Sequence, residues 1–215
     1  EIGLGVQLLV RLSGFFFGRV GRNQAVFTLF SIQRAPVDPE DLRGLDPART
    51  GVAFLDRTVS IGPDGATTRP RMQPLAVAPG TALVAVVRIE TTREGARLTE
   101  AVRADVAASV AAAARTDVRG VQIDFDARES EREFYRALLH DLRARLPAET
   151  ALTMTALASW CMEDGWISVL PVDEAVPMLF RMGADGPGIR AHLNRGDDFP
   201  VRACRQSLGL STDEP

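Results

Sequence analysis

Apolar and polar residues alternate in several short runs of the chain, and this pattern predicts a series of strands. Residues 81–90, TALVAVVRIE, are almost continuously apolar and end in charge, as is typical of a parallel strand covered on both faces. Between 118 and 126, apolar residues alternate with Gln122, Asp124 and Asp126, so these three polar side chains share one face of a strand. Five further strands are predicted at 25–33, 51–61, 151–160, 174–182 and 207–215.

Helical spacing and turn signals separate these strands. Valines recur every four residues in alanine-rich sequence after Thr99, which predicts a helix there. A second helix is predicted up to Leu146, and Ser130 and Glu133 fit a capping box at its start. The sequence GPDG at 62–65 predicts a turn that folds the second strand back on itself as a hairpin.

The order of the elements predicts an α/β protein with a parallel sheet. Strands separated by helices or loops are typical of right-handed crossovers between parallel strands. Polar residues end several different strands, which favours a (β/α)8 TIM-like barrel, where active sites form at the carboxyl ends of the strands. No glycine-rich phosphate loop follows the first strand, so a nucleotide-binding doubly wound sheet is disfavoured.

Seven strands are predicted, whereas a complete barrel of this type has eight. We therefore expect residues 25–215 to form one barrel domain that stops before its eighth strand and carries the hairpin as an insertion. The wall should be open between the first and seventh strands, which would leave unpaired edges. Residues 1–24 form an uncertain segment before this domain.

Composition narrows the possible partners. With 215 residues, of which 46% are hydrophobic, the chain can bury a sizeable core in one domain. The formal charge of -3 comes from interspersed acidic and basic residues, which disfavours nucleic acid as a partner.

The apolar run 6–17 is too short for a membrane span, and is either core or the remnant of an export signal. With two histidines, a histidine-rich metal site is disfavoured, and no cofactor is predicted.

The two cysteines are expected to be unpaired. Cys161 and Cys204 form no CxxC pattern, so neither a zinc site nor a redox pair is indicated. Cys161 ends the predicted fifth strand and Cys204 precedes the seventh, so they should lie toward opposite ends of the barrel. A disulfide needs Cα atoms within about 7 Å of each other.

The candidate site centres on the polar face of the fourth strand. Two carboxylates and an amide on the inner face of a covered strand are costly unless they bind something or pair with a cation. The structural alternative is that buried arginines hold Asp124 and Asp126. Polar or aromatic residues at the ends of other strands are expected to join them in a substrate site: Arg88, Glu90, Trp160, Arg181, Asp213 and Glu214.

Five segments together resemble the bacterial family called domain of unknown function 3142: GVQIDFDA, SEREFYRALL, LTMTALASWC, LPVDEAVPMLFRMG and STDEP. The resemblance runs from Gly51 to Pro215. That family is similar in turn to glycoside hydrolase family 18, chitinase-like (β/α)8 barrels whose fourth strand reads DGxDxDxE. On that motif Gln122 and Asp124 take the places of two inward aspartates, and Asp126 takes the place of the proton-donating glutamate.

The resemblance implies a carbohydrate-active, glycoside-hydrolase-like enzyme. Asp126 would be the general acid, with its pKa raised by the charge of Asp124 nearby. Trp160 would stack on a sugar face, and Asp213 or Glu214 would supply a further carboxylate. One alternative is a non-catalytic glycan-binding or scaffold protein on the same barrel.

A divalent metal held by Asp124, Asp126 and Glu214 is a third possibility, because carboxylate oxygens are hard ligands. A polysaccharide or oligosaccharide ligand favours export to the periplasm or envelope, and leaves a cytoplasmic location open.

Overall fold

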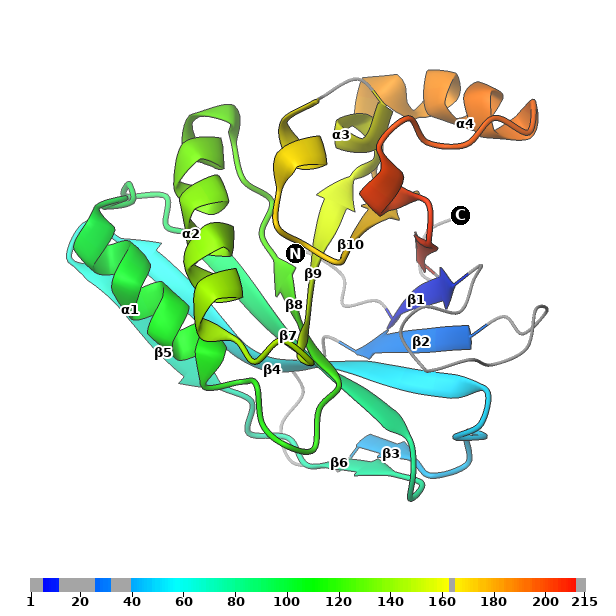
Figure 1. Ribbon diagram of the computed structural model, residues 1–215, viewed down its shortest axis with the longest axis horizontal. Helices are drawn as coiled ribbons and strands as arrows, with labels where there is room; N and C mark the ends of the chain where they lie inside the picture. The colour runs from blue at the N-terminus through cyan, green and yellow to red at the C-terminus, as the bar shows by residue number, and fades with distance from the viewer. Residues whose placement is uncertain (1–5, 12–25, 32–39, 163–164, 212–215) are drawn as a thin grey trace.

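The protein is an α/β structure built around one large, mostly parallel sheet (Figure 1). The computed structural model describes residues 6–11, 26–31, 40–162 and 165–211. The strands are β1 (Val6–Arg11), β2 (Val26–Ser31), β3 (Glu40–Leu42), β4 (Thr50–Gly62), β5 (Gly65–Pro70), β6 (Leu75–Val77), β7 (Ala82–Thr91), β8 (Gly120–Asp124), β9 (Ala151–Leu157), β10 (Glu174–Met178) and β11 (Ser207–Ser211).

In the described ranges, four α-helices and four short 3-10 helices connect these strands. The α-helices are α1 (Glu100–Ala111), α2 (Arg132–Arg145), α3 (Ala158–Met162) and α4 (Gly186–Asn194). The 3-10 helices are η1 (Glu129–Glu131), η2 (Gly165–Val169), η3 (Gly183–Asp185) and η4 (Arg202–Cys204).

Seven strands follow one another in parallel pairings, as the spacing of the apolar runs predicts. The pairings run in chain order from β2 through β4, β7, β8, β9 and β10 to β11. The predicted hairpin is also confirmed, because β5 pairs antiparallel with β4 and Gly62 lies opposite Gly65. Gly65 has a φ of +126°, a backbone conformation that side-chain-bearing residues rarely adopt.

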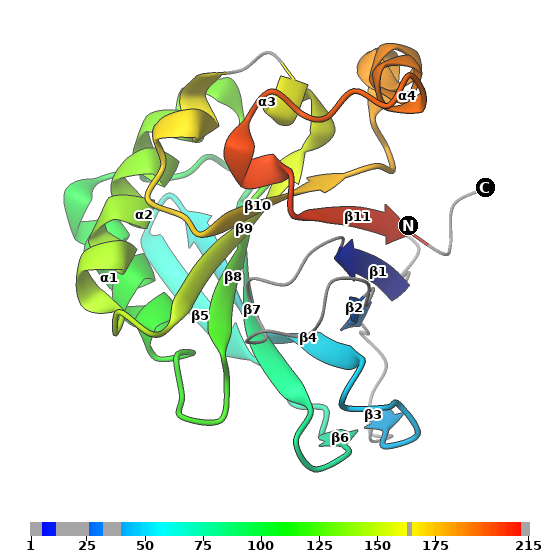
Figure 2. The same ribbon diagram turned by 45° about the vertical axis from the view of Figure 1, so that its right-hand side comes forward.

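The expectation of an open edge between the first and seventh predicted strands was wrong. β1 lies there and pairs antiparallel with both β2 and β11, as Figure 2 shows. The apolar sequence VQLLVR, in which we saw core or a signal remnant, supplies this strand. A strand that runs antiparallel to its neighbours can satisfy the backbone groups of both without a helical crossover.

The two faces of the sheet bury different kinds of residue. On the face packed against the helices, Val87, Ile123 and Met154 join Val106 of α1 and Leu138 of α2 in the main core. In Figure 1, α1 and α2 lie side by side on this outer face. The opposite, inner face carries buried polar side chains, which are Gln122, Thr153, Thr155, Glu174 and Ser207. Strand alternation therefore separates an apolar outer layer from a polar interior.

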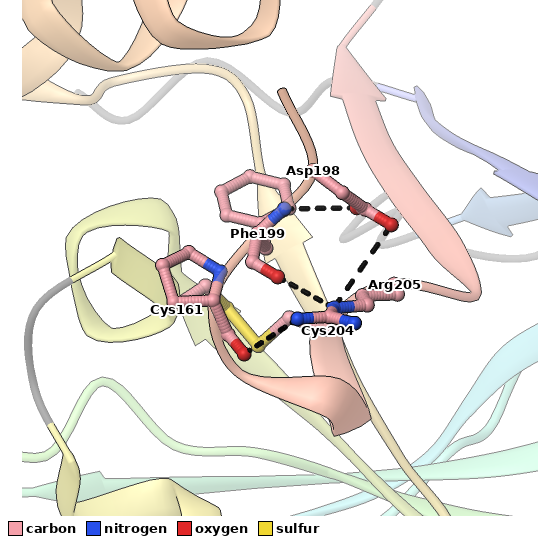
Figure 3. Close-up of a disulfide and its surroundings, with 6 residues drawn as sticks. Cys161, Asp198, Phe199, Cys204 and Arg205 are labelled. Atoms are coloured by element: carbon pink, nitrogen blue, oxygen red, sulfur yellow. Dashed lines mark hydrogen bonds and ion pairs between the residues drawn. A yellow bond between two sulfur atoms is a disulfide. The ribbon is translucent and has the colours of Figure 1, made fainter. Parts of the chain in front are cut away.

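The two cysteines form a disulfide, which corrects our expectation that they are unpaired. Cys161 and Cys204 are both fully buried and their Cα atoms lie 6.0 Å apart (Figure 3). The expectation failed because the chain leaving β9 turns at once into α3, which packs back on β9 and β10. η4 packs on β10 as well, so both cysteines reach the same place.

Candidate functional site

Asp124 ends β8 and faces the interior of the sheet. Thr155 of β9 donates its hydroxyl hydrogen to Oδ1 of Asp124 over 2.9 Å. Arg88 of β7 lies opposite Asp124 in the register of the two strands, and its guanidinium nitrogen is 3.9 Å from Oδ2. Three neighbouring parallel strands thus bring a hydroxyl, a carboxyl and a guanidinium together at their carboxyl ends.

The environment of Asp124 favours its protonated form. Its side chain is 13% exposed, and burial raises the pKa of this carboxyl above its ordinary value. The guanidinium of Arg88 and the hydrogen bond from Thr155 act against the rise in the pKa, whereas the carboxylates of Asp126 and Glu90 add to it. Asp124 therefore holds a proton more readily than an ordinary aspartate.

A pocket of about 230 Å³ opens where β7 and β8 end. The carboxylate pair, Asp124 and Asp126, lines it. Its lining residues are Arg88, Ile89, Glu90, Thr91, Asp124, Phe125, Asp126 and Arg128. Asp126 is exposed, because β8 ends two residues before it. Arg88 also contacts Glu90, with its Nε 3.3 Å from a carboxylate oxygen. Arg88 thus links the carboxylates of Glu90 and Asp124 on one wall of the pocket, while Asp126 stays open to solvent.

The segment after β8, which includes the lining residue Arg128, is fixed by a capping contact two residues earlier than we predicted. The carboxylate of Glu131 accepts a hydrogen bond of 2.7 Å from the backbone N–H of Arg128. Ser130 lies within η1, and Glu133 pairs with Arg136 instead of capping the helix. The Ser130–Glu133 capping box was therefore wrong, because a turn of 3-10 helix precedes α2 and moves its start to Arg132.

Residues 79–182 match the family described as "Domain of unknown function (DUF3142)". The chain carries a DUF3142 domain. The matched residues include β7, β8, β9 and β10, and therefore every residue of the pocket described above.

A solved structure, "Crystal structure of the Chitinase Domain of the Spore Coat Protein CotE from Clostridium difficile", is similar at 13% sequence identity and a TM-score of 0.45. The match covers 82% of this chain, which spans 66% of that chain's length. No curated protein sequence matches.

Trp160 of the DUF3142 domain lies away from the pocket. The predicted strand 151–160 ends at Leu157, so Trp160 falls on α3 and is 3% exposed. Its ring meets that of Trp166 edge-on, with centroids 5.0 Å apart. Tyr135 and Phe125 extend this buried aromatic cluster, with centroid distances of 6.0 Å from Tyr135 to Trp166 and 5.1 Å from Tyr135 to Phe125.

The other predicted site residues are spread over the sheet. Gln122 is 2% exposed on the inner face below Asp124, and its Nε2 has no hydrogen-bond partner among the residues described. Arg181 is exposed and lies beyond the end of β10, since that strand stops at Met178. Its φ of 50° makes it the one non-glycine residue in the described ranges with a left-handed backbone. Asp213 and Glu214 lie outside the described residues.

A larger pocket of about 610 Å³ lies at the opposite, amino-terminal ends of β7, β8 and β9. Its lining includes Thr81, Arg115, Asp117, Arg119 and Glu149. Parallel α/β structures assemble active sites at the carboxyl ends of their strands, so we place the candidate site in the smaller pocket.

The part of the chain that the structure describes shows neither a cluster of metal-binding side chains nor a membrane-spanning helix. Within it, no group of three or more His, Cys, Asp or Glu side chains is placed to hold a metal ion. Glu214, the third ligand of the metal site considered above, lies outside it. None of the helices in this part of the chain is long and apolar enough to cross a membrane.

Two residues near the carboxylate pair were missed from the sequence. Thr155 alternates with apolar neighbours in TMTAL just as Asp124 does in QIDF, and that shared alternation places both on the inner face. Tyr135 lies within the apolar repeat of α2, where it looks like an ordinary core residue. Only the packing of α2 against Phe125 brings it near the site.

Proposed function

We propose that this protein is a carbohydrate-active enzyme of the glycoside hydrolase type, with Asp124 and Asp126 as its acid–base pair. One observation carries the proposal: a buried carboxyl with a raised pKa and an exposed carboxyl line the same pocket. Two carboxyl groups in different environments can divide the work of proton donor and ionised partner. The resemblance of GVQIDFDA to the fourth-strand motif of chitinase-like barrels supports a glycan as the substrate.

In this proposal Asp124 carries the proton and Asp126 is the ionised partner, the reverse of the roles suggested by the sequence motif. The reason is burial, which raises the pKa of Asp124, whereas Asp126 stands in solvent beyond the end of the strand. Arg88 and Glu90, which line the same pocket, would bind the sugar. Trp160 receives no stacking role, because it is buried against Trp166.

We also propose that the sheet is a chitinase-like (β/α)8 barrel formed by residues 25–215 together with β1. Support comes from the pairings at its two ends. β2 pairs with β4 on one side and with β1 on the other, and β1 pairs with β11. Eight strands would then enclose the polar inner face that carries Gln122 and Asp124.

The experiment measures release of reducing ends from bacterial envelope and storage polysaccharides, with N-acetylated polymers first. Asp124→Asn and Asp126→Asn should each keep the fold and lower turnover by about 10² to 10⁴, the usual contribution of general acid–base catalysis. Asp105→Asn, at an exposed position of α1, is the matched control and should leave turnover unchanged.

The alternative function gives a different result in the same experiment. If the wild type binds a glycan without releasing reducing ends, and both variants bind it equally well, the enzyme proposal is wrong. The non-catalytic glycan-binding protein would then be the better description, because its pocket would hold the sugar without proton transfer.

A further inference from the structure

Strand β4 contains a β-bulge that reverses the direction of its side chains. Leu55 lies opposite Val86 of β7, but Arg57, two residues later, lies opposite the very next residue of that strand, Val87. Asp56 is therefore the extra residue of the bulge. Because side chains alternate along a strand, every residue of β4 after the bulge faces the side that it would otherwise turn away from.

The packing of β4 shows the same reversal. Residues at even positions before the bulge and at odd positions after it pack in the main core with the helices: Val52, Phe54, Val59 and Ile61. Thr58 and Ser60, at even positions after the bulge, therefore face the polar inner side of the sheet.

Ion pairs on the outer side hold the bulge in place. The carboxylate of Asp56, which is buried, lies 2.7 Å from Nε of Arg57 and also pairs with Arg115, from the segment between α1 and β8. Arg57 donates a hydrogen bond of 2.9 Å to the backbone carbonyl of Ser109 in α1. The backbone carbonyl of Asp56 accepts another, of 2.8 Å, from the N–H of Arg71. These contacts fix the bulge, and with it the inward direction of the residues that follow.

The reversal brings two hydroxyl groups beside the candidate site. β4 and β7 lie side by side (Figure 1), with Thr58 opposite Arg88 and Ser60 opposite Glu90. Neighbouring strands are about 4.8 Å apart, and both Arg88 and Glu90 line the pocket that holds Asp124. Neither hydroxyl makes a hydrogen bond within the described part of the chain, although Thr58 is buried and Ser60 is half-buried. Buried hydroxyls usually have a partner, so these two are available to a ligand.

We propose that Thr58 and Ser60 are further substrate-binding residues, and that the site takes a chain of sugar units instead of a single one. Polar groups of the inner face continue across four neighbouring strands, from β4 through β7 and β8 to Thr155 on β9. Three strand spacings amount to about 14 Å, which is longer than one pyranose ring. The two hydroxyls hydrogen-bond the sugar unit that lies on the β4 side of Arg88 and Glu90. The inference rests on the proposed function, which it extends from the type of reaction to the length of the substrate.

A competing explanation is that the bulge serves only to bend a long strand. β4 has 13 residues, and a bulge increases the local twist that a curved sheet needs. Thr58 and Ser60 would then bind internal water, and no ligand would touch them.

The test measures the binding of oligosaccharides from two to six units long by Thr58→Val and Ser60→Ala. N-acetylglucosamine oligomers and maltooligosaccharides are titrated calorimetrically in the Asp124→Asn background, so that they are not consumed. Each variant should bind the longer oligomers about fivefold more weakly, which corresponds to one hydrogen bond. The two-unit oligomers, which do not extend to β4 from the carboxylate pair, should lose less affinity.

Two controls accompany these variants. Thr58→Ser keeps the hydroxyl and should bind like the parent. Thr116→Val, at an exposed position by the opposite ends of the strands, should do the same. Urea unfolding separates binding from folding: because the two hydroxyls have no partner in the described structure, Thr58→Val and Ser60→Ala should not lower the free energy of unfolding.

The outcomes distinguish this inference from the proposed function. Unchanged affinity in both variants, while the wild type releases reducing ends, would overturn the inference and leave the proposed function standing. Weaker binding in both variants, without hydrolysis by the wild type, would support the inference and contradict only the enzyme. A loss of affinity that is equal at every length, or that comes with lower stability, would mean disturbed packing and would also overturn the inference. If neither oligomer series binds, the inference is wrong, and the reducing-end assay on polysaccharides decides the proposed function separately.

Discussion

Thr155 on β9 donates a hydrogen bond of 2.9 Å to the carboxyl oxygen of Asp124 on β8. This contact joins the two strands at the level of the pocket and opposes the effect of burial on the pKa of Asp124. Because a hydroxyl that donates to a carboxylate stabilises its charged form, Thr155 tunes the protonation of the candidate acid.

Replacing Thr155 by valine should raise the pKa of Asp124 further. The valine keeps the shape of the side chain and removes the donor, so the carboxylate loses one source of stabilisation, and a rise of about one unit is expected. Carboxyl titration by NMR measures it. Thr153→Val, two residues earlier on the same inner face, is the control. If both variants leave the pKa of Asp124 unchanged, the hydrogen bond from Thr155 does not affect its titration.

Asp124→Asn should make the protein more stable at neutral pH. The raised pKa of Asp124 means that the folded state binds the proton more tightly than the unfolded chain, whose aspartates titrate at about 3.9. Wild-type stability therefore falls as pH rises from that value through the pKa of the folded state. The loss is about 1.4 kcal/mol for each unit by which the folded and unfolded pKa values differ. Urea unfolding at several pH values should show a variant that is more stable above this window and equal to the wild type below it. A variant that is less stable at every pH would contradict the burial penalty.

Gln122→Met should leave the free energy of unfolding unchanged or raise it by about 1 kcal/mol. The substitution removes a buried Nε2 that has no partner in the described structure and replaces it with an apolar group of similar length. Chemical denaturation measures the difference. A clear loss of stability would show that Gln122 does have a partner, for which an internal water is the simplest candidate.

Replacing Cys161 and Cys204 together by serine should lower the free energy of unfolding by about 2–4 kcal/mol. The disulfide joins positions 43 residues apart. Without it the unfolded chain has more conformational entropy, which lowers the free energy of unfolding. Reduced wild type should match the double variant in urea unfolding. Alkylation before reduction followed by intact-mass measurement provides the direct check. Two alkylated thiols in the unreduced protein would refute the disulfide.

The sequence predicted the parallel strands well, because each depends on a local pattern of apolar and polar positions. It also placed Arg88 and Asp124 in one predicted site, and the two lie opposite each other on the adjacent strands β7 and β8. The roles of Asp124 and Asp126 could not be assigned in the same way. These roles depend on where β8 stops. The alternation of polar and apolar residues continues past Asp124 to Asp126, so the sequence does not show that the strand ends at Asp124. A strand ending at Asp124 buries one carboxyl and leaves the other in solvent.

The failed predictions concern contacts between segments far apart in the chain. Trp160 looked like the end of a strand, but the chain turns into α3 and buries it against Trp166. The meeting of Cys161 and Cys204 depends on that same turn and on η4 packing against β10. No local pattern encodes such packing, since it results from how two connections share one surface of the sheet.

The disulfide also bears on the conditions in which the chain reaches its stable form. Bonds of this kind form and persist in oxidising compartments, whereas glutathione and thioredoxin keep cytosolic thiols reduced. The chain has only two cysteines, so oxidation can give one intramolecular pairing and needs no isomerase to correct it. In a reducing cytosol the same chain would hold the segment from α3 to η4 by packing alone. Heterologous production in an oxidising host compartment is therefore the route to the fully cross-linked protein.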